Sequence, residues 1–309
     1  MSISEGIPFE AAAADPVLDD APLPRGKRPR NIGLWVSVTT LVLIVLACFV
    51  GPMLLGADAT EQKLSQRLKP PFWLDGSVPG KPFGTDAFGR DMLARTLEGG
   101  RVSLEVGFGA ATGAVLIGVL LGLVAGYRGG WVDRAVMAVS DVWIAFPFLV
   151  LALAAVAVVG SSVPVLIALL TLGGWVLPTR VTRTIAQRLR GEDYVLAAAG
   201  AGATDGYIIR KHILPQVIPA NLVVWSFTVG TLVIIEGALS FLGLGVKPPQ
   251  PSWGNILSDG VNYLETAWWI CLWPALMLVT TVVATNGLGT GLRRRWESGA
   301  TAVDIKDTP

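Results

Sequence analysis

Five long runs without a charged side chain constrain this chain more strongly than any other feature of its sequence. A helix needs about 20 apolar residues to cross roughly 30 Å of hydrocarbon, because each residue adds about 1.5 Å. The run at residues 142–179 would form a helix of about 57 Å, which is too long for one crossing. Its middle, residues 160–164, reads Gly-Ser-Ser-Val-Pro and predicts a turn between two helices. We therefore expect an all-α polytopic membrane protein with about six transmembrane helices. The runs cover residues 31–57, 106–127, 142–179, 212–235 and 266–292.

The composition agrees with a membrane protein. Charged residues make up 15% of the chain and hydrophobic residues 52%, whereas about 25% of a soluble domain is charged. The two cysteines, Cys48 and Cys271, lie inside apolar runs, so we expect neither a disulfide framework nor a thiolate metal site. Residues 1–30 lack the short basic start of a signal peptide, and we expect a disordered cytoplasmic tail there.

The distribution of Lys and Arg predicts the orientation of the spans. If the N-terminus is cytoplasmic, 16 of the 24 basic residues lie in cytoplasmic segments, as the positive-inside rule requires. Both termini and the polar segment 192–219 are then cytoplasmic. The chain divides into the tail 1–30, a first span with an extracytoplasmic loop at 31–101, a transmembrane core at 102–295 and a tail at 296–309.

The polar segment 192–219 contains an unbroken run of Ala and Gly at residues 197–203. A helix with so little side-chain bulk lets another protein approach its backbone closely, so we expect a short docking helix around residues 197–205. The segment resembles the EAA loop of bacterial ABC importer permeases at Ala197, Ala198, Gly202 and Leu214-Pro215, with Leu196 in place of the usual acid. By this resemblance, the residues that couple to an ATPase are Ala197, Ala198, Gly202, Ala203, Thr204 and Asp205.

The loop before the second span contains two short polar motifs. Gly84-Thr85-Asp86 and Gly89-Arg90-Asp91 can each cap a helix or form an Asx turn, which predicts a loop that positions the second span. The string resembles the GTDxxGRD segment of dipeptide, oligopeptide and nickel permeases. The structural motif comprises Gly84, Thr85, Asp86, Gly89, Arg90 and Asp91.

Small and ionisable residues stand out near the second and third spans. Glycines at four-residue intervals, Gly118, Gly122 and Gly126, predict a flat helix face for close packing in lipid. Asp133 can pair with a neighbouring side chain or a headgroup. Asp141 lies about two turns into the third span, where it is either a functional acid or a hydrated residue near a helix end.

Glu236 interrupts the fifth apolar run near its expected outer end. An isolated carboxylate there is costly, so we expect either a buried, hydrogen-bonded acid between helices or an acid that lines the translocation path. The Pro- and Gly-rich loop at 241–263 resembles the same permease subgroup almost residue for residue. The candidate pathway or gate residues are Glu236, Trp253 and Asn255; a structural cap over the bundle is the alternative.

Several motifs of enzymes and nucleotide-binding proteins are absent from the sequence. It has no GxxxxGK[ST] loop, HExxH or CxxC motif, and its single histidine, His212, is interpreted as interfacial. We therefore expect no catalytic residue, metal site or cofactor in this chain. An ion-coupled secondary transporter, with ionisable residues at the bilayer midplane, and an intramembrane enzyme, with paired catalytic side chains, are weaker alternatives.

The resemblance extends over about residues 31–293 and implies the C-type permease subunit of dipeptide, oligopeptide and nickel ABC importers. Thr290 departs from the family pattern, which has an acid there. The resemblance implies a type I importer fold in a bacterial plasma membrane and di- or oligopeptide cargo. A nickel chelate, glutathione or an oligosaccharide is the alternative cargo. The implied partners are a B-type permease, two cytoplasmic ATPases that bind ATP and Mg, an extracytoplasmic solute-binding protein and lipid, with no nucleic acid.

Overall fold

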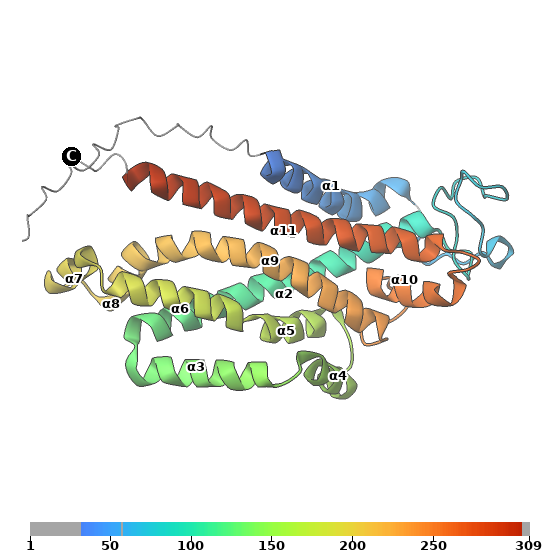
Figure 1. Ribbon diagram of the computed structural model, residues 1–309. Coiled ribbons are helices and arrows are strands. Elements are labelled where there is room, and N and C mark those ends of the chain that lie inside the picture. Colours follow the sequence, from blue (N-terminus) through green and yellow to red (C-terminus); the bar gives the residue numbers. More distant parts are fainter. Residues whose placement is uncertain (1–31, 57, 305–309) are drawn as a thin grey trace, which may run out of the picture. The chain divides into compact units, whose positions relative to one another are not determined.

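The computed structural model describes residues 32–56 and 58–304, all of which belong to the unit Asn31–Pro309. The tail expected at residues 1–30 lies outside the described residues. Within the described part, helices dominate, and the only β pairing is an isolated bridge between Thr85 and Asp91. The all-α prediction is confirmed (Figure 1). The α-helices are α1 Ile32–Leu55, α2 Met92–Arg128, α3 Gly130–Ala145, α4 Phe148–Val159, α5 Val163–Gly174, α6 Val176–Arg190, α7 Asp193–Gly200, α8 Asp205–Ile208, α9 Leu214–Phe241, α10 Trp253–Gly260 and α11 Trp269–Asp304. The shorter helical segments are η1 Leu64–Gln66, η2 Ile209–Ile213 and η3 Val261–Tyr263.

The helices account for up to six membrane spans, as expected. Four helical stretches are long and apolar enough to cross a membrane, and two bent pairs, α3–α4 and α5–α6, can each supply one more. The turn expected at residues 160–164 is confirmed, because α4 ends at Val159 and α5 begins at Val163.

Each of the two spans expected around residues 142–179 is a bent pair of helices. The first bends by 83° between α3 and α4, and the second by 43° between α5 and α6. Pro147 explains the sharper bend, since proline removes a backbone donor and forces the preceding residue out of the helical region. Phe146 accordingly has an extended conformation, with φ −90° and ψ 132°.

The second span begins earlier than its uncharged run suggests. The helix starts at Met92 rather than near residue 106, so the expected boundary at 101/102 falls inside α2. The additional turns carry charged residues, which a search for uncharged runs excludes. The last helix similarly continues through residues 296–304, where a tail was expected.

Helix α2 lies at the centre of the bundle and packs against α1, α5, α6 and α9. The predicted glycine face forms its contact with α6. A Cβ atom at Gly122 would lie 2.6 Å from the carbonyl oxygen of Thr179, and one at Gly126 would lie 2.6 Å from that of Arg183. The role of these glycines in close packing is therefore confirmed. Helix α9 runs beside α2 and joins the α7–α8 end of the bundle to the α10 end (Figure 1).

Candidate functional site

The Ala- and Gly-rich segment forms two short helices separated by a turn. The single helix expected around residues 197–205 is wrong, because α7 ends at Gly200 and α8 begins at Asp205. Gly202 has φ +86°, a left-handed conformation that favours glycine. Two hydrogen bonds close the turn: the Gly202 amide donates to the Ala199 carbonyl (3.0 Å), and the Ala203 amide donates to the Ala198 carbonyl (3.1 Å). Gly202 therefore terminates α7, in the manner of a glycine C-cap.

Buried apolar side chains anchor this segment, residues 193–213, to the helix bundle. Val195 of α7 and Ile208 of α8 are buried in one cluster with Leu123 of α2, Leu189 of α6 and Val217 of α9. Because one core contains side chains from all five helices, the segment cannot be displaced without moving the spans.

Polar and aromatic contacts add to this anchoring. The Tyr127 hydroxyl donates to Asp205 Oδ1 at 2.9 Å, and the Gln216 amide donates to the Tyr194 hydroxyl at 2.9 Å. The ring of His212 lies 5.8 Å from that of Tyr194 and 5.9 Å from that of Tyr207. His212 thus joins α7 to α8 by aromatic packing.

The six residues assigned to ATPase coupling divide between two sides of the segment. Ala198 and Ala203 pack towards the buried cluster. The other four are exposed, and two of these also hold the local structure: Thr204 Oγ1 accepts from the Tyr207 amide at 3.4 Å as the α8 N-cap, and Asp205 accepts from Tyr127. The exposed four are Ala197, Gly202, Thr204 and Asp205.

Three exposed side chains of this segment were not assigned from the sequence. Leu196, Tyr207 and Tyr194 are 56%, 49% and 42% exposed. We call these three residues and the exposed Ala197 the docking face. In the sequence, Leu196 was noted only as a departure from the family motif.

Glu236 lies at the opposite end of α9 and is fully buried. The Ser240 hydroxyl donates to Glu236 Oε1 at 2.6 Å. The hydroxyls of Ser103 on α2 and Ser252 at the α10 N-cap lie beside the same carboxyl group. Three helices therefore meet at one buried acid, as expected for a hydrogen-bonded acid between helices.

Trp253 and Asn255 hold α10 in place. Trp253 is fully buried, and its Nε1 donates to the Thr96 carbonyl on α2 at 2.9 Å. Asn255 and Ser252 form a reciprocal capping box: the Ser252 amide donates to Asn255 Oδ1 (2.8 Å), and the Asn255 amide donates to Ser252 Oγ (3.3 Å). A pathway or gate role for Glu236, Trp253 and Asn255 stays a prediction, since the contacts described here are structural.

A buried ion network connects the loop before α2 to α10. Asp86 is 2% exposed and accepts hydrogen bonds from Arg90 Nε (2.6 Å) and from Arg95 Nη1. The two guanidinium groups also contact Asp259 of α10, at 3.2 Å from Arg95 and 3.4 Å from Arg90. Burial alone raises the pKa of Asp86, but the charges of Arg95 and Arg90 outweigh it and hold the pKa below its ordinary value. Arg95 was missed from the sequence because its partners lie 9 and 164 residues away.

The two polar motifs perform both of the roles expected of them. Asp86 Oδ1 accepts from the Phe88 amide at 2.9 Å in an Asx turn, and Asp91 caps α2 by accepting from the Leu93 amide at 2.8 Å. Gly89 has φ +74°, and a Cβ atom there would collide with the Lys63 carbonyl. Thr85 Oγ1 accepts from the Lys69 amide at 2.8 Å. The loop therefore positions the second span, as predicted.

The two acids of α3 pair with arginines of α6. Arg183 binds Asp133 through two nitrogens, with Nη2 2.6 Å from Oδ2. Arg180 Nη2 lies 2.6 Å from Asp141 Oδ1, and both side chains are partly exposed. Asp141 is thus an ion-paired residue at the surface of this chain.

Comparison with known proteins identifies relatives over most of the sequence. A family model described as "Binding-protein-dependent transport system inner membrane component" matches residues 118–298. The dipeptide transport system permease protein DppC of Alkalihalophilus pseudofirmus is 36% identical, covering 85% of this chain and 83% of that protein. The oligopeptide transport system permease protein OppC of Bacillus subtilis is 35% identical, covering 84% of this chain and 83% of that protein. The glutathione transport system permease protein GsiD of Pectobacterium atrosepticum is 34% identical, covering 85% of this chain and 86% of that protein.

Proposed function

Because the chain belongs to the family of binding-protein-dependent transport system inner membrane components, we propose that it is the C-type permease subunit of an ATP-driven importer of di- and oligopeptides. One observation carries the choice of cargo. The chain is similar, along about 85% of its length, to permeases named for dipeptide and oligopeptide transport. As a family member, it is a multi-pass component of the bacterial inner membrane.

The docking face supports a coupling role in this importer. An ATPase cleft would take up Leu196, Ala197 and the exposed turn at Gly202, where small side chains leave the backbone accessible. Movement of the ATPase would pass to the spans through Val195 and Ile208, since both lie in the core shared with α2, α6 and α9. Helix α9 would carry the movement towards Glu236 and α10.

The complete importer needs components that this chain does not supply. In the proposal, two cytoplasmic ATPases bind ATP and Mg, a B-type permease forms the other half of the path, and an extracytoplasmic binding protein delivers the cargo. Both termini and the docking face are then cytoplasmic, while α10 and the loop before α2 are extracytoplasmic. The chain itself catalyses no reaction in this scheme.

Reconstitution of the complex in proteoliposomes tests the proposal. Ala197→Trp should place a bulky ring on the docking face and lower both binding-protein-stimulated ATP hydrolysis and peptide uptake by at least tenfold. Ala154→Trp, at an exposed alanine of α4, is the matched control and should leave both rates within twofold. Undiminished coupling in Ala197→Trp would exclude docking at this face. ATP-independent uptake by the isolated chain would instead favour a secondary transporter.

A further inference from the structure

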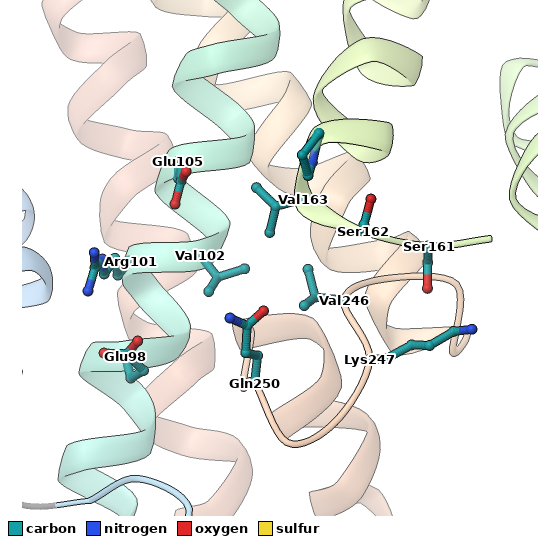
Figure 2. Close-up of a pocket in the computed structure, with 11 residues that line it drawn as sticks. Glu98, Arg101, Val102, Glu105, Ser161, Ser162, Val163, Val246, Lys247 and Gln250 are labelled. Atoms are coloured by element: carbon teal, nitrogen blue, oxygen red, sulfur yellow. The ribbon is translucent and has the colours of Figure 1, made fainter. Parts of the chain in front are cut away.

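A pocket of about 530 Å³ lies at the α10 end of the bundle, where three separate segments meet (Figure 2). One wall is the first part of α2, a second is the turn between α4 and α5, and a third is the loop between α9 and α10. Its volume falls within the range of about 300–1,000 Å³ that is usual for small-molecule sites. The polar residues that line it include Glu98, Glu105, Ser161, Lys247 and Gln250.

Opposite charges occupy opposite sides of this pocket. Glu98 and Glu105 are seven residues apart on α2 and therefore share one face of the helix. Figure 2 shows Lys247 and Ser161 on the far side, with the amide of Gln250 between the two groups. Neither glutamate nor the lysine forms a salt bridge with any residue in the described ranges.

Arg101 also lines the pocket, three residues after Glu98 and four before Glu105, and forms no salt bridge with either glutamate in the described ranges. In Figure 2 the guanidinium of Arg101 lies on the other side of α2. It is directed at α1, where its central carbon lies 5.8 Å from the ring centre of Phe49. The α2 wall of the pocket thus carries two glutamates and one arginine whose guanidinium is turned towards α1, and Lys247 on the far side forms no salt bridge with them.

Part of the pocket lining is apolar. Val102 and Val246 are 5% and 6% exposed and belong to the main core, and Val163 packs against the same core. A lining that is partly apolar, with charged groups at both sides, suits an elongated molecule that is cationic at one end, anionic at the other and mostly uncharged between them.

We infer that this pocket is a transient subsite for short peptides with free termini. The inference rests on the proposed importer function and specifies where this subunit recognises its cargo. The N-terminal ammonium group lies against one of the two glutamates, Glu98 or Glu105, and the C-terminal carboxylate lies against Lys247 and Ser161. Gln250 can donate to and accept from the peptide backbone between them.

Weak binding is expected from this geometry and suits a transport path. Lys247 and Glu105 are exposed, and exposed ion pairs contribute little because water and salt screen them. A site of this kind orients a peptide without retaining it. Such a site does not require particular peptide side chains, because its charges bind the two termini, which every unmodified peptide carries.

The test uses the whole complex in proteoliposomes, with its binding protein saturated with trialanine. We expect Glu98→Gln/Glu105→Gln and Lys247→Gln each to lower trialanine uptake by three- to tenfold. ATP hydrolysis stimulated by the loaded binding protein should stay within twofold, so more ATP is consumed per peptide. Glu265→Gln and Lys63→Gln change exposed charges outside the pocket and should leave both rates unchanged.

The termini are tested directly with trialanine amide, which lacks the C-terminal carboxylate. Lys247→Gln should reduce uptake of both peptides, but the factor by which it reduces trialanine uptake should be at least three times the factor for the amide. Equal uptake by the pocket variants and the unaltered complex overturns the subsite. Weakened attachment of the binding protein to the variants also overturns it, since the pocket would then be a protein contact. Absence of peptide uptake by the unaltered complex overturns the proposed function itself, and the peptide assignment with it.

Discussion

Arg95 of α2 and Asp86 of the preceding loop form an ion pair in which the side chains are 4% and 3% exposed. Asp259 of α10 contacts the same arginine, so a loop, a span and a short helix converge on one guanidinium group. Breaking a buried pair by removing one partner leaves a charge uncompensated. The pair therefore makes the α10 end of the bundle sensitive to single substitutions.

We expect Asp86→Asn to lower the free energy of unfolding by about 3 kcal/mol, because buried Arg95 and half-buried Arg90 lose their shared carboxylate. Thermal unfolding of the purified subunit in detergent measures the change. Asp259→Asn is the control, since that side chain is 49% exposed and its pairs are screened. Equal losses in both variants would contradict a special role for the buried pair.

The same pair predicts a pH dependence. The folded-state pKa of Asp86 lies below the ordinary value of about 3.9, so ionised Asp86 stabilises the fold fully above about pH 4. That contribution is lost as the pH falls through the lowered folded-state pKa. The difference in melting temperature between the unaltered protein and Asp86→Asn should thus be constant from pH 7 to 5 and shrink towards pH 3. A difference that does not change with pH would contradict this assignment.

Gly122→Ala should destabilise the contact between α2 and α6. Its new methyl group would meet the Thr179 carbonyl oxygen at 2.6 Å, and overpacking of this kind costs about 1–3 kcal/mol. Gly33→Ala is the matched control in α1, because no atom lies within 4 Å of the added carbon. Melting temperatures of the two variants provide the comparison. A loss in Gly33→Ala as large as that in Gly122→Ala would argue against packing as the cause.

Gly202→Ala tests the turn that separates α7 from α8. No atom lies within 4 Å of the added carbon, so the left-handed backbone alone opposes the change, at about 1–2 kcal/mol. Hydrogen exchange at residues 193–208 should become about 5–30 times faster. Gly200→Ala, with equal space but no positive φ, should leave the exchange rate unchanged or slow it. Unchanged exchange in Gly202→Ala would show that the turn is not held in this conformation.

Substitutions of Glu236 separate its hydrogen bonding from its charge. Glu236→Gln retains an acceptor for the Ser240 hydroxyl and should change the free energy of unfolding by less than about 1 kcal/mol. Glu236→Leu removes the acceptor of the buried Ser240 hydroxyl and should cost about 1–3 kcal/mol. Uptake by the stable Glu236→Gln variant then reports on the pathway role. Normal uptake would restrict Glu236 to holding α2, α9 and α10 together.

Much of the fold was predictable from the sequence, because its signals are local. Uncharged runs of sufficient length predict membrane spans wherever they occur. Pro and Gly residues within these runs indicate where the backbone turns. The packing face formed by Gly118, Gly122 and Gly126 could be predicted from the helical repeat alone. Asp91 was recognised as a possible cap for the same reason, since a cap and its amides are neighbours in the chain.

The remaining features depend on contacts between distant segments, which no local pattern encodes. Arg95 and Asp259 are 164 residues apart, yet they share one ion network. The sequence placed Gly202 in a docking helix, whereas in the structure it forms the turn between α7, which carries Val195, and α8, which carries Ile208. The spans were thus evident from hydrophobicity along the chain. Where charges meet, and which of them stay unpaired, follows from the packing of α2, α9 and α10 in three dimensions.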